Sequence, residues 1–497
     1  MGLIIDCFAG GGGASVGIEM ALGREVDIAI NHDPEAIRMH QVNHPNTLHL
    51  TEDIFAVDLQ RYVKGRPVDL LWASPDCTSH SKAKGGQPRK QGLRILPWAV
   101  YKHAKTILPS VIIMENVEEI QQWGPLDENG KPIASRKGED YKKFITAMKS
   151  LGYMFDSREL VAADYGAPTT RKRWYAIFRR DGKDIVWPEQ THSKNGKDGY
   201  LPWEPIWKHL DLQDFGNSIF GRKKPLAYNT MNRIARGLEK FIFKCPEPFM
   251  VQVNHGGNTF RGQSIHEPIP TITSKHGYGI VTPLLIQYHS ETTSSGVRGQ
   301  KVTEPIQTID TSNRYGLVLP FLTKFYKSGT GQSMLEPIHT ITTSPGQMSI
   351  YAIPIKELEN YLDASSNDIL QKATWVSRFI MEYCGIGQNK PINPICTKDG
   401  FASITVMGNT YAILDIYLRM LNPGELKSGQ GFPEDYIIDH DITGKKISKA
   451  GQVARIGNSV VPIMAKELVL ANCSYLKVGE RMPNMRISEE EPQLKFA

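Results

Sequence analysis

The chain has 497 residues, of which 40% are hydrophobic and 22% are charged, a composition typical of soluble globular proteins with two or three domains. It shows neither a leader-like N-terminus nor an apolar run of membrane-spanning length, so we expect a cytoplasmic protein without membrane contact. A formal net charge of +6 is compatible with a polyanionic partner but selects none, and six scattered cysteines without Cys-x-x-Cys pairs predict free thiols.

The N-terminal stretch has the pattern of a strand, a glycine loop and a helix. Apolar residues 3–5 lead through Asp6 and Phe8 into four consecutive glycines, among them Gly10, Gly12 and Gly13. Glycines let the backbone turn tightly and approach a ligand, and the following helix presents free N–H groups. This order predicts the first unit of a nucleotide-type Rossmann sheet, although a plain tight turn would also explain the glycines.

Two apolar stretches end in polar residues, at positions where a Rossmann fold contacts a nucleoside. A predicted strand over 26–30 ends in Asn31 and Asp33, near the position of the side chain that binds a ribose in such folds. Asp53 and Ile54 could bracket an adenine ring by a hydrogen bond and an apolar contact. A solvated turn is the alternative for this second pair.

A lone cysteine follows the next apolar run. Residues 68–72 predict a buried parallel strand, and Pro75 and Asp76 break the pattern just before Cys77. The thiol would then lie at the carboxyl end of the strand, where open α/β sheets bind ligands, unless it packs as a small hydrophobe. The glycine-rich basic stretch 85–94 predicts a loop that closes over a substrate or simply faces solvent.

Two later segments supply a carboxylate and two arginines. An apolar run ends in Glu115, which is a candidate proton donor if buried; alternatively, Asn116 caps a helix and leaves Glu115 solvated. Arg171 and Arg173 lie two residues apart in a predicted strand, so they share one face while Lys172 points to the other. Two guanidinium groups on one side suit phosphate groups or base edges.

From about residue 246 the sequence repeats itself. The template Glu-Pro-Ile-x-Thr-Ile-Thr/Asp begins at Glu267, Glu304 and Glu336, with starts 37 and 32 residues apart. This spacing predicts small units of strands around glycine-rich turns. Polar side chains between the templates could bond to base edges, and a purely structural β-rich module would explain the repeats too.

The last part of the chain returns to helical patterns. Residues 418–426 open a helix at a proline, and the segment from Gly457 begins another helix whose apolar positions suit burial. The charged run 487–497 is expected to fray.

In this order, the motifs resemble those of the cytosine-5 DNA methyltransferases over nearly the whole chain. The matching segments are Asp6-x-Phe8-x-Gly10-x-Gly12-Gly13, Pro75-Asp76-Cys77, Glu115-Asn116-Val117, Arg171-x-Arg173, residues 418–433 and Gly457-Asn458-Ser459-Val460. The chain departs from the family pattern at Asp76, Asn31 and Thr169, where the family usually has proline, glutamate and glutamine.

The resemblance implies an α/β fold, with a Rossmann-like S-adenosylmethionine-dependent methyltransferase domain and an inserted, β-rich, repeat-containing target-recognition domain. The implied parts are a catalytic domain, a connecting region, the recognition domain, C-terminal helices that return to the catalytic domain, and a tail; they span residues 1–185, 186–245, 246–410, 411–475 and 476–497. Because the repeats fall within the insertion, this analogy favours a role in reading DNA.

The implied reaction transfers a methyl group from S-adenosylmethionine to carbon 5 of a flipped-out cytosine within a specific short sequence of double-stranded DNA. Cys77 would add covalently to carbon 6, because carbon 5 becomes nucleophilic only after that addition. Glu115 would bond or protonate N3 and the exocyclic amine, while Arg171 holds the carbonyl oxygen with support from Arg173. The base must leave the duplex because its carbon 5 is otherwise out of reach.

The cofactor site implied by the resemblance draws on both ends of the chain. Its residues are Asp6, Phe8, Gly10, Gly12, Gly13, Asn31, Asp33, Asp53, Ile54, Asp76, Asn458, Ser459 and Val460. No metal is expected. We expect a monomer in the cytoplasm of a bacterial or phage-infected cell, and a cognate restriction enzyme would be its genetic partner.

Two other functions fit parts of the sequence. One is RNA methylation, because a branch of the same family modifies tRNA, but that branch has a small insertion where this chain has a large one. The other is a catalytically inactive DNA-binding module, and the joint presence of Cys77, Glu115 and Arg171 argues against it.

Overall fold

The computed structural model describes residues 2–76, 94–211, 217–228 and 415–478, the single positions 214, 230, 231, 234, 375, 376 and 379, and the backbone of short strands between 249 and 414. The described residues do not include Cys77 or the following residues 78–93, which contain most of the basic stretch. They also do not include the three Glu-Pro-Ile templates.

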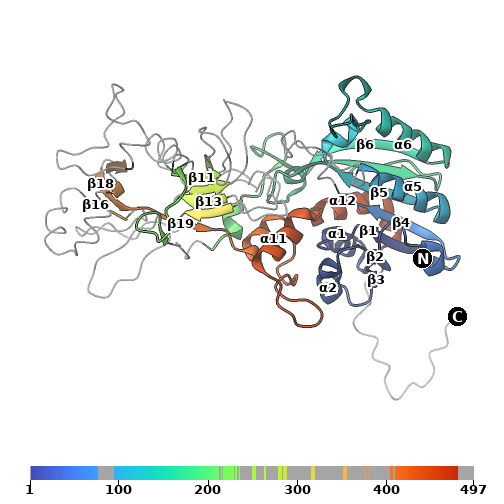
Figure 1. Cartoon of the computed structure of the whole chain (residues 1–497), viewed down its shortest axis with the longest axis horizontal. Coiled ribbons are helices and arrows are strands. Elements are labelled where there is room, and N and C mark those ends of the chain that lie inside the picture. The colour runs from blue at the N-terminus through green and yellow to red at the C-terminus, as the bar shows by residue number, and fades with distance from the viewer. Residues whose placement is uncertain are drawn as a thin grey trace, which may run out of the picture.

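A seven-stranded sheet forms the centre of the N-terminal half (Figure 1). Its order is β3-β2-β1-β4-β5-β7-β6, in which β7 runs antiparallel to both neighbours and the other pairs are parallel. The strands are β1 (Leu3–Cys7), β2 (Ile28–Ile30), β3 (Leu48–Leu50), β4 (Val68–Ala73), β5 (Val111–Asn116), β6 (Met154–Val161) and β7 (Lys172–Arg179). The predicted Rossmann-like α/β fold is confirmed.

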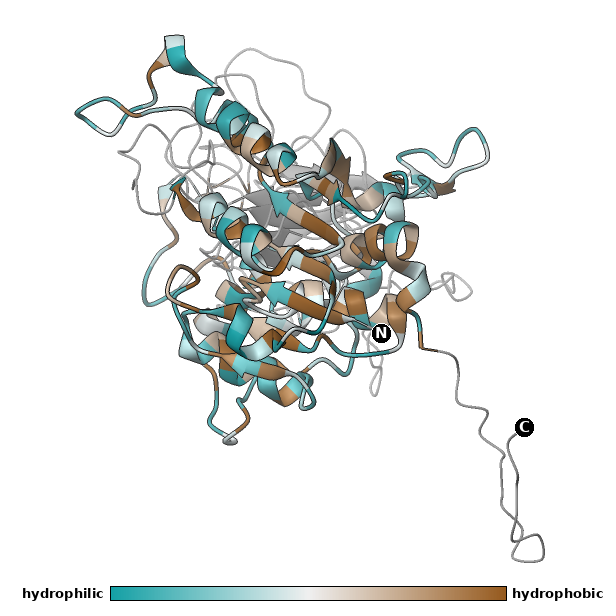
Figure 2. Ribbon diagram, turned by 90° about the vertical axis from the view of Figure 1, so that its right-hand side faces the viewer, coloured by the Kyte–Doolittle hydropathy of each residue, from teal (hydrophilic) through white to brown (hydrophobic). Residues whose placement is uncertain are grey.

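Helices cover both faces of this sheet because alternate side chains of each buried strand point to opposite sides. In β1, Leu3, Ile5 and Cys7 join the core under one face, while Ile4 joins the core under the other. The first face is packed by α3 (Leu59–Val63), α5 (Leu96–Ile107) and α6 (Glu139–Ser150), and the second by α1 (Gly13–Leu22) and α12 (Pro462–Cys473). Figure 2 shows mostly hydrophobic strands at the centre, between helices with hydrophilic outer sides.

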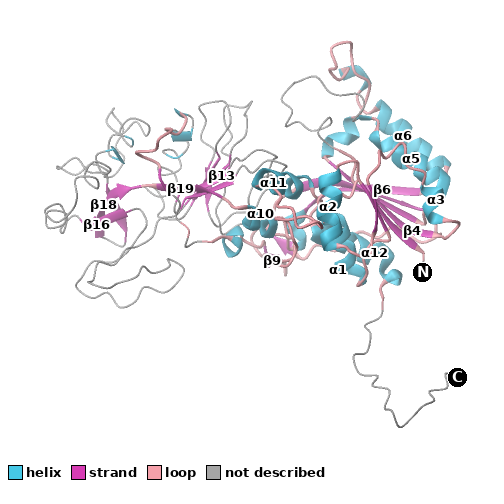
Figure 3. Cartoon of the chain, turned by 60° about the horizontal axis from the view of Figure 1, so that its bottom comes forward, coloured by secondary structure: helices cyan, strands magenta, loops and turns pink. Residues whose placement is uncertain are grey.

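The C-terminal helices pack beside the N-terminal glycine loop. A Cβ atom on Gly17 of α1 would lie 2.2 Å from the Pro462 carbonyl oxygen of α12, so the absence of a side chain lets the two helices touch. Three further helices, α2, α10 and α11, lie around this contact (Figure 3). They span Pro34–Asn43, Pro423–Gly429 and Lys449–Asn458. Short 3-10 turns are η2 (Glu118–Gln122), η3 (Ala134–Arg136), η4 (Ala162–Tyr165), η5 (Ile206–His209) and η8 (Ser474–Leu476).

Most of the remaining strands form a β-rich region apart from the central sheet (Figure 3). Its larger sheet has the order β10-β19-β13-β11-β12-β14-β15, its smaller sheet has the order β16-β18-β17, and β8 and β9 pair separately. The strands are β8 (His192–Ser193), β9 (Leu201–Pro202), β10 (Asn217–Ser218), β11 (Phe249–Gln252), β12 (Gly262–Ser264), β13 (Tyr278–Val281), β14 (Leu284–Gln287), β15 (Tyr315–Val318), β16 (Tyr351–Pro354), β17 (Ser403–Val406), β18 (Asn409–Asp415) and β19 (Tyr417–Met420).

One sequence-based boundary needs correction. We expected C-terminal helices from residue 411, but residues up to Met420 belong to strands β18 and β19, and helix α10 starts only at Pro423. The reason is local: the Asn422 side chain accepts the backbone N–H of Glu425, whose own side chain accepts the N–H of Asn422, and this capping box fixes the helix start.

The described residues contain neither a membrane-spanning helix nor a metal-binding cluster of acidic, His or Cys side chains. No helix in that part of the chain is long and apolar enough to cross a membrane. In the same residues, no group of three or more His, Cys, Asp or Glu side chains has an arrangement that could hold a metal ion.

Candidate active site

The carboxyl ends of three neighbouring strands form the candidate site. In β1, β4 and β5, Cys7 pairs with Ala73, which in turn pairs with Met114. The strand order reverses between β1 and β4, because β2 and β3 lie beyond β1 while β5 lies beyond β4. Open α/β sheets bind ligands at such a reversal. The glycine loop, the segment before Cys77 and Glu115 therefore meet at one edge of the sheet.

The glycine loop has two kinds of glycine. Gly10 and Gly12 have φ angles of 49° and 82°, and Gly12 is the N-cap of α1. Among the described residues, a Cβ atom on Gly10 would meet nothing closer than 3.5 Å, whereas one on Gly12 would lie 2.0 Å from Tyr436 Oη and one on Gly13 2.0 Å from the Val460 carbonyl oxygen. Gly10 leaves space beside the loop, and the other two permit close packing of the C-terminal segment.

The predicted ribose-binding residues lie just after β2. Asn31 is half-buried, and its Oδ1 accepts the backbone N–H of Asp33 at 2.8 Å. The Asp33 carboxylate caps α2 by accepting the N–H of Glu35, and it lies 2.9 Å from Nη2 of Arg455. Asp33 is thus committed to contacts within the protein, which leaves Asn31 as the better candidate of the two.

The predicted adenine-binding pair lies in a turn after β3. The exposed Asp53 carboxylate accepts the N–H of Phe55 at 2.8 Å, and Ile54 is buried with 6% of its surface exposed. The carbonyl oxygen of Ile54 lies 2.9 Å from Nε2 of His103 on α5. The turn is therefore fixed to the sheet, and contact of either side chain with a cofactor stays a prediction.

Hydrogen bonds from both neighbouring strands hold the segment that leads to Cys77. The backbone N–H of Ser74 donates to the Cys7 carbonyl oxygen of β1 at 3.3 Å. On the other side, Nδ2 of Asn116 donates to the Pro75 carbonyl oxygen at 2.9 Å, and Asn116 is fully buried. Asn116 thus fixes the backbone two residues before the predicted nucleophile.

Glu115 is buried beside both predicted arginines. Its Oε1 lies 3.1 Å from Arg173 Nε and 4.0 Å from Arg171 Nη2, and only 6% of the Glu115 surface is exposed. Lys172 points the other way and pairs with Glu118 at 3.0 Å. The prediction that the two arginines share one face is confirmed, and the alternative of a solvated Glu115 is excluded.

Arg171 also connects to the closing motif. Its Nη1 donates to the Gly457 carbonyl oxygen at 3.1 Å, and its backbone N–H donates to Thr169 Oγ1 at 3.2 Å. Gly457 is near the end of α11 and starts the predicted Gly-Asn-Ser-Val cofactor motif. Arg171 therefore links Glu115 to the predicted closing motif, a contact across 286 residues in sequence that no local pattern could reveal.

The closing motif contains one accessible residue. Asn458, the last residue of α11, is exposed, whereas Ser459 and Val460 are buried. The Ser459 carbonyl oxygen accepts Nε2 of Gln430 at 3.1 Å. Asn458 is therefore the member of the motif that is open to a ligand, and Ser459 and Val460 form part of the wall behind the glycine loop.

Two residues that sequence reasoning did not single out support the loop from the C-terminal side. Tyr436 Oη donates to the Gly11 carbonyl oxygen at 3.0 Å, 425 residues away in sequence. Lys427 Nζ donates to the Tyr436 carbonyl oxygen at 2.9 Å, and burial lowers the pKa of this lysine. A buried lysine thus fixes the segment from which the tyrosine reaches the loop.

Comparison with known proteins gave matches along the chain. The family model of C-5 cytosine-specific DNA methylases matches residues 3–472. Type II methyltransferase M.AquIA of Picosynechococcus sp. is 28% identical over 201 residues, which are 39% of this chain and 78% of that protein. Type II methyltransferase M1.HphI of Haemophilus parahaemolyticus is 26% identical over 303 residues, 58% of this chain and 68% of that protein. A crystal structure of a Spodoptera frugiperda DNMT2 mutant aligns with a TM-score of 0.46 at 14% identity, covering 94% of this chain and 98% of that chain.

Proposed function

The chain belongs to the family of C-5 cytosine-specific DNA methylases, and from this premise we propose how its residues perform the reaction. The protein is a DNA (cytosine-5-)-methyltransferase, which transfers a methyl group to carbon 5 of cytosine in DNA. The relatives are type II methyltransferases, which places the activity in the context of restriction and modification.

We propose that S-adenosylmethionine binds at the carboxyl ends of β1, β2 and β4. The residues there fit a nucleoside with an amino acid tail, because no other described residue fills the space beside the Gly10 backbone and several polar or aromatic side chains of this edge are accessible. Phe8 and Asn31 are half-buried, and Asp76 and Asn458 are exposed. When bound, the cofactor supplies an electrophilic methyl group.

The other predicted cofactor residues would lie behind the residues that contact the cofactor. Asp6, Gly12, Gly13, Ser459 and Val460 are buried or packed against other parts of the protein. We infer that they shape the loop and exclude water from it rather than touch the ligand. Among the residues at the end of β2, Asn31 would take the ribose contact, since the Asp33 carboxylate already pairs with protein groups.

We propose Cys77 as the nucleophile that adds to carbon 6 of the cytosine. A thiolate is needed because carbon 5 is a poor nucleophile until a group at carbon 6 makes the ring electron-rich. When the proton at carbon 5 leaves after methylation, the bond to sulfur breaks and the thiolate is released. Asn116 would support this step by fixing the Pro75 carbonyl oxygen, and thereby the backbone that carries the thiol.

Glu115 and the two arginines would hold the ring while charge develops on it. Glu115 would donate a hydrogen bond or a proton to N3 and accept a hydrogen bond from the exocyclic amine, which relieves the charge created by thiolate addition. Arg173 lies 3.1 Å from the carboxylate and would fix its orientation, while Arg171 would reach the carbonyl oxygen of the base. The meeting of these three buried side chains beside the strand that leads to Cys77 is the observation that carries the proposal.

Substrate recognition would involve the β-rich region. We propose that residues 246–410 form an inserted target-recognition domain that reads a short sequence in double-stranded DNA, and that the cytosine is flipped out toward the sheet edge. A parallel register between Tyr278 of β13 and Tyr315 of β15, which follow successive templates, supports a repeated architecture in this region. A monomeric state and a cognate restriction enzyme as genetic partner stay predictions.

The test is transfer of labelled methyl groups from S-adenosylmethionine to duplex DNA of varied sequence, with RNA assayed in parallel. We expect 5-methylcytosine in DNA at one short sequence, and labelling of RNA alone would contradict the assignment. DNA that carries 5-fluorocytosine should trap a covalent complex, because the fluorine at carbon 5 cannot leave as a proton does. Loss of the trapped complex in Cys77→Ser would identify the nucleophile.

A further inference from the structure

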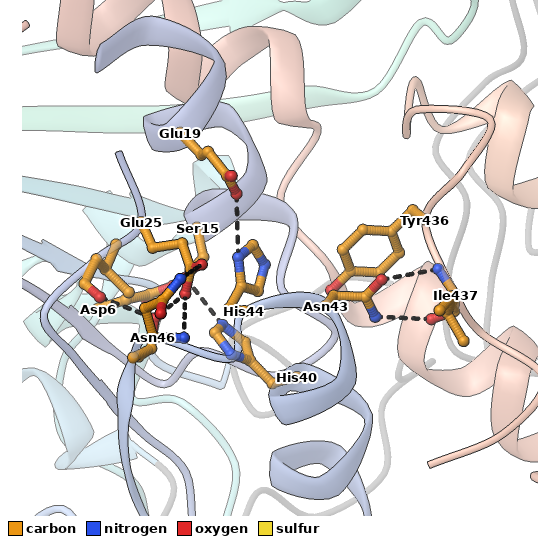
Figure 4. A network of polar contacts seen from close by, with 12 residues as sticks. Asp6, Ser15, Glu19, Glu25, His40, Asn43, His44, Asn46, Tyr436 and Ile437 are labelled. Atoms are coloured by element: carbon orange, nitrogen blue, oxygen red, sulfur yellow. Dashed lines mark hydrogen bonds and ion pairs between the residues drawn. The ribbon is translucent and has the colours of Figure 1, made fainter. Parts of the chain in front are cut away.

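A chain of hydrogen bonds lies beneath the glycine loop, apart from the groups that act on the base. Ser15 Oγ donates to Asp6 Oδ2 at 2.7 Å, His40 Nε2 lies 2.9 Å from Ser15 Oγ, and His49 Nε2 lies 2.8 Å from His40 Nδ1. Asp6, Ser15 and His40 are each 0% exposed. Figure 4 shows these three side chains next to one another, contributed by β1, α1 and α2.

The buried carboxyl of Asp6 has no compensating cation among the described residues. Burial raises the pKa of Asp6 to about 7, and the hydrogen bonds from Ser15 oppose this only in part. Burial also lowers the pKa values of His40, far below the ordinary range, and of His49. Near neutral pH the two imidazoles are therefore uncharged, while the carboxyl is close to half protonated.

The other titratable groups around this chain do not supply the missing charge. The His44 ring lies 4.4 Å from the His40 ring, and its Nδ1 faces Glu19 at 3.2 Å. From the C-terminal segment, burial and the nearby Asp6 raise the pKa of Tyr436, and on β1 the same two causes raise the pKa of Cys7. These two groups therefore stay neutral, and the proton balance of Asp6 depends on Ser15 and the imidazoles.

The hydrogen bonds from His49 through His40 and Ser15 to Asp6 can all point in either of two opposite directions. With Asp6 ionised, His49 Nε2–H donates to His40 Nδ1, His40 Nε2–H donates to Ser15 Oγ, and the Ser15 hydroxyl donates to the carboxylate. A proton that binds His49 at Nδ1 reverses every bond: each group passes on its former proton, and Asp6 ends as a neutral carboxyl that donates to Ser15. One proton is taken up and none is lost within the chain.

His49 is placed to exchange this proton with solvent. It lies on β3 and is half-buried, and Glu25 and the backbone of Thr47 face it, both of which favour a proton on its ring. The four residues thus connect the outer side of the sheet edge with the buried end of β1, directly before the glycine loop.

We propose that Ser15, His40 and His49 are positioning residues that pass a proton between solvent and Asp6, and so set the charge beneath the cofactor loop. An ionised Asp6 favours S-adenosylmethionine, whose sulfonium is cationic, over S-adenosylhomocysteine, whose sulfur is neutral, because the carboxylate attracts the positive charge through a poorly screened interior. Product release would therefore become easier relative to substrate binding as pH rises. The inference rests on the proposed cofactor site at the glycine loop.

The test compares the dissociation constants of S-adenosylmethionine and S-adenosylhomocysteine by calorimetry between about pH 5.5 and pH 8.5. In the unmodified protein, the preference for S-adenosylmethionine should increase about tenfold as pH passes through the titration of Asp6. Asp6→Asn should make the preference independent of pH. Carbon NMR of the Asp6 carboxyl, recorded without cofactor, gives the titration midpoint of Asp6 in the free protein, independently of binding.

Two substitutions of His40 distinguish an effect of its hydrogen bonds on the Asp6 midpoint from an effect of its packing. His40→Phe keeps a ring but removes the donor to Ser15, so the Asp6 midpoint should rise by about one pH unit. His40→Gln can place an amide donor near the position of Nε2 and should keep the midpoint close to its original value. His44→Phe is the matched control, because it removes an equally buried neighbouring imidazole outside the chain.

The possible results are distinct. An unchanged NMR midpoint in His40→Phe, or equal midpoint shifts in His40→Phe and His44→Phe, would overturn the inference, as would binding of both compounds with a preference that does not vary with pH. If neither compound binds at any pH, the proposed cofactor site itself is wrong and the preference falls with it, while the NMR midpoints still report whether the chain controls Asp6.

Discussion

Two buried carboxylates lie at the ends of strands that flank β4, and their surroundings differ. Asp6 on β1 accepts a hydrogen bond from the neutral hydroxyl of Ser15, whereas Glu115 on β5 faces the guanidinium groups of Arg173 at 3.1 Å and Arg171 at 4.0 Å. Burial removes both carboxyl groups from water, but among the described residues only Glu115 has cations to replace that hydration.

The two carboxyl groups therefore differ in their partners: Asp6 belongs to a hydrogen-bond chain of hydroxyl and imidazole groups, whereas Glu115 belongs to a cluster with two guanidinium groups. A chain of hydroxyl and imidazole groups can reverse its direction, while an arginine keeps its proton under all ordinary conditions. We therefore expect the cofactor side of the site to respond to pH and the base side to depend on an intact set of charges.

The largest effect is expected at Cys77, which follows β4 in the sequence. Cys77→Ala should abolish methyl transfer, because no other group can form the bond to carbon 6. The unfolding midpoint and the affinity for S-adenosylmethionine should remain close to those of the unmodified protein, since the described contacts of Asp6 and Glu115 are all retained. Methyl transfer to DNA, thermal unfolding and calorimetry provide the three readouts. Normal turnover by the variant would overturn the proposed mechanism.

The second largest effect on methyl transfer is expected from a substitution of Glu115. Glu115→Gln keeps the shape of the side chain but removes its charge, and we expect methyl transfer to fall by about 10²–10⁴. Arg171 and Arg173 would then be buried without their carboxylate, so the free energy of unfolding should decrease as well. Adding Arg173→Met should restore part of the stability but none of the activity. Recovery of both together would show that Glu115 acts through folding alone.

The two kinds of glycine in the loop give a matched pair. Gly12→Ala would place a Cβ atom 2.0 Å from Tyr436 Oη at a φ of 82°, so the free energy of unfolding should fall by about 2–5 kcal/mol. Gly10→Ala meets no described atom closer than 3.5 Å and should cost only about 1–2 kcal/mol, while weakening cofactor binding. Tyr436→Phe should partly rescue Gly12→Ala, because the clashing oxygen is removed. Denaturant unfolding measures all three, and equal costs for the two glycines would contradict the packing argument.

The elements that sequence could predict are those set by local patterns. Apolar runs that end in a polar residue located β1, β4 and β5, and a two-residue spacing placed Arg171 and Arg173 on one face, because both effects depend only on neighbouring residues. The contact of Tyr436 with Gly11 and the bond from Arg171 to Gly457 span 425 and 286 residues, and no local pattern encodes such a pairing.

The polar chain under the loop and the β-rich region show a different limit. His40 and His49 belong to no recognisable motif, and their link to Asp6 exists only because β1, α2 and β3 are packed together. In the β-rich region the repeats predicted short strands, and described strands such as β13 and β15 do follow the templates. Their pairing partners depend on the sheet as a whole, which is why the order of that sheet could not be read from the repeats.

A smaller effect is expected at the backbone before the nucleophile. Asn116→Ala removes the donor to the Pro75 carbonyl oxygen and leaves a buried acceptor unpaired, which should cost about 1–2 kcal/mol of unfolding free energy. Because the change loosens the segment that carries Cys77, kcat should fall about tenfold while KM for DNA stays nearly constant. A rise in KM for DNA with an unchanged kcat would assign Asn116 to DNA binding instead.

The smallest effect separates the two carboxylates by pH. The pKa of Asp6 is raised from 3.8 to about 7, so between these values the folded protein holds a proton that the unfolded chain has lost. The contribution of Asp6 to stability is therefore present at low pH and is lost as pH rises toward and through 7. Between about pH 6 and pH 8 this loss should amount to about 1 kcal/mol in the unmodified protein. In Asp6→Asn, this loss of unfolding free energy between about pH 6 and pH 8 should disappear. In Glu115→Gln, it should remain. An identical slope in the unmodified protein and in Asp6→Asn would mean that the buried carboxyl at the end of β1 does not titrate in this range.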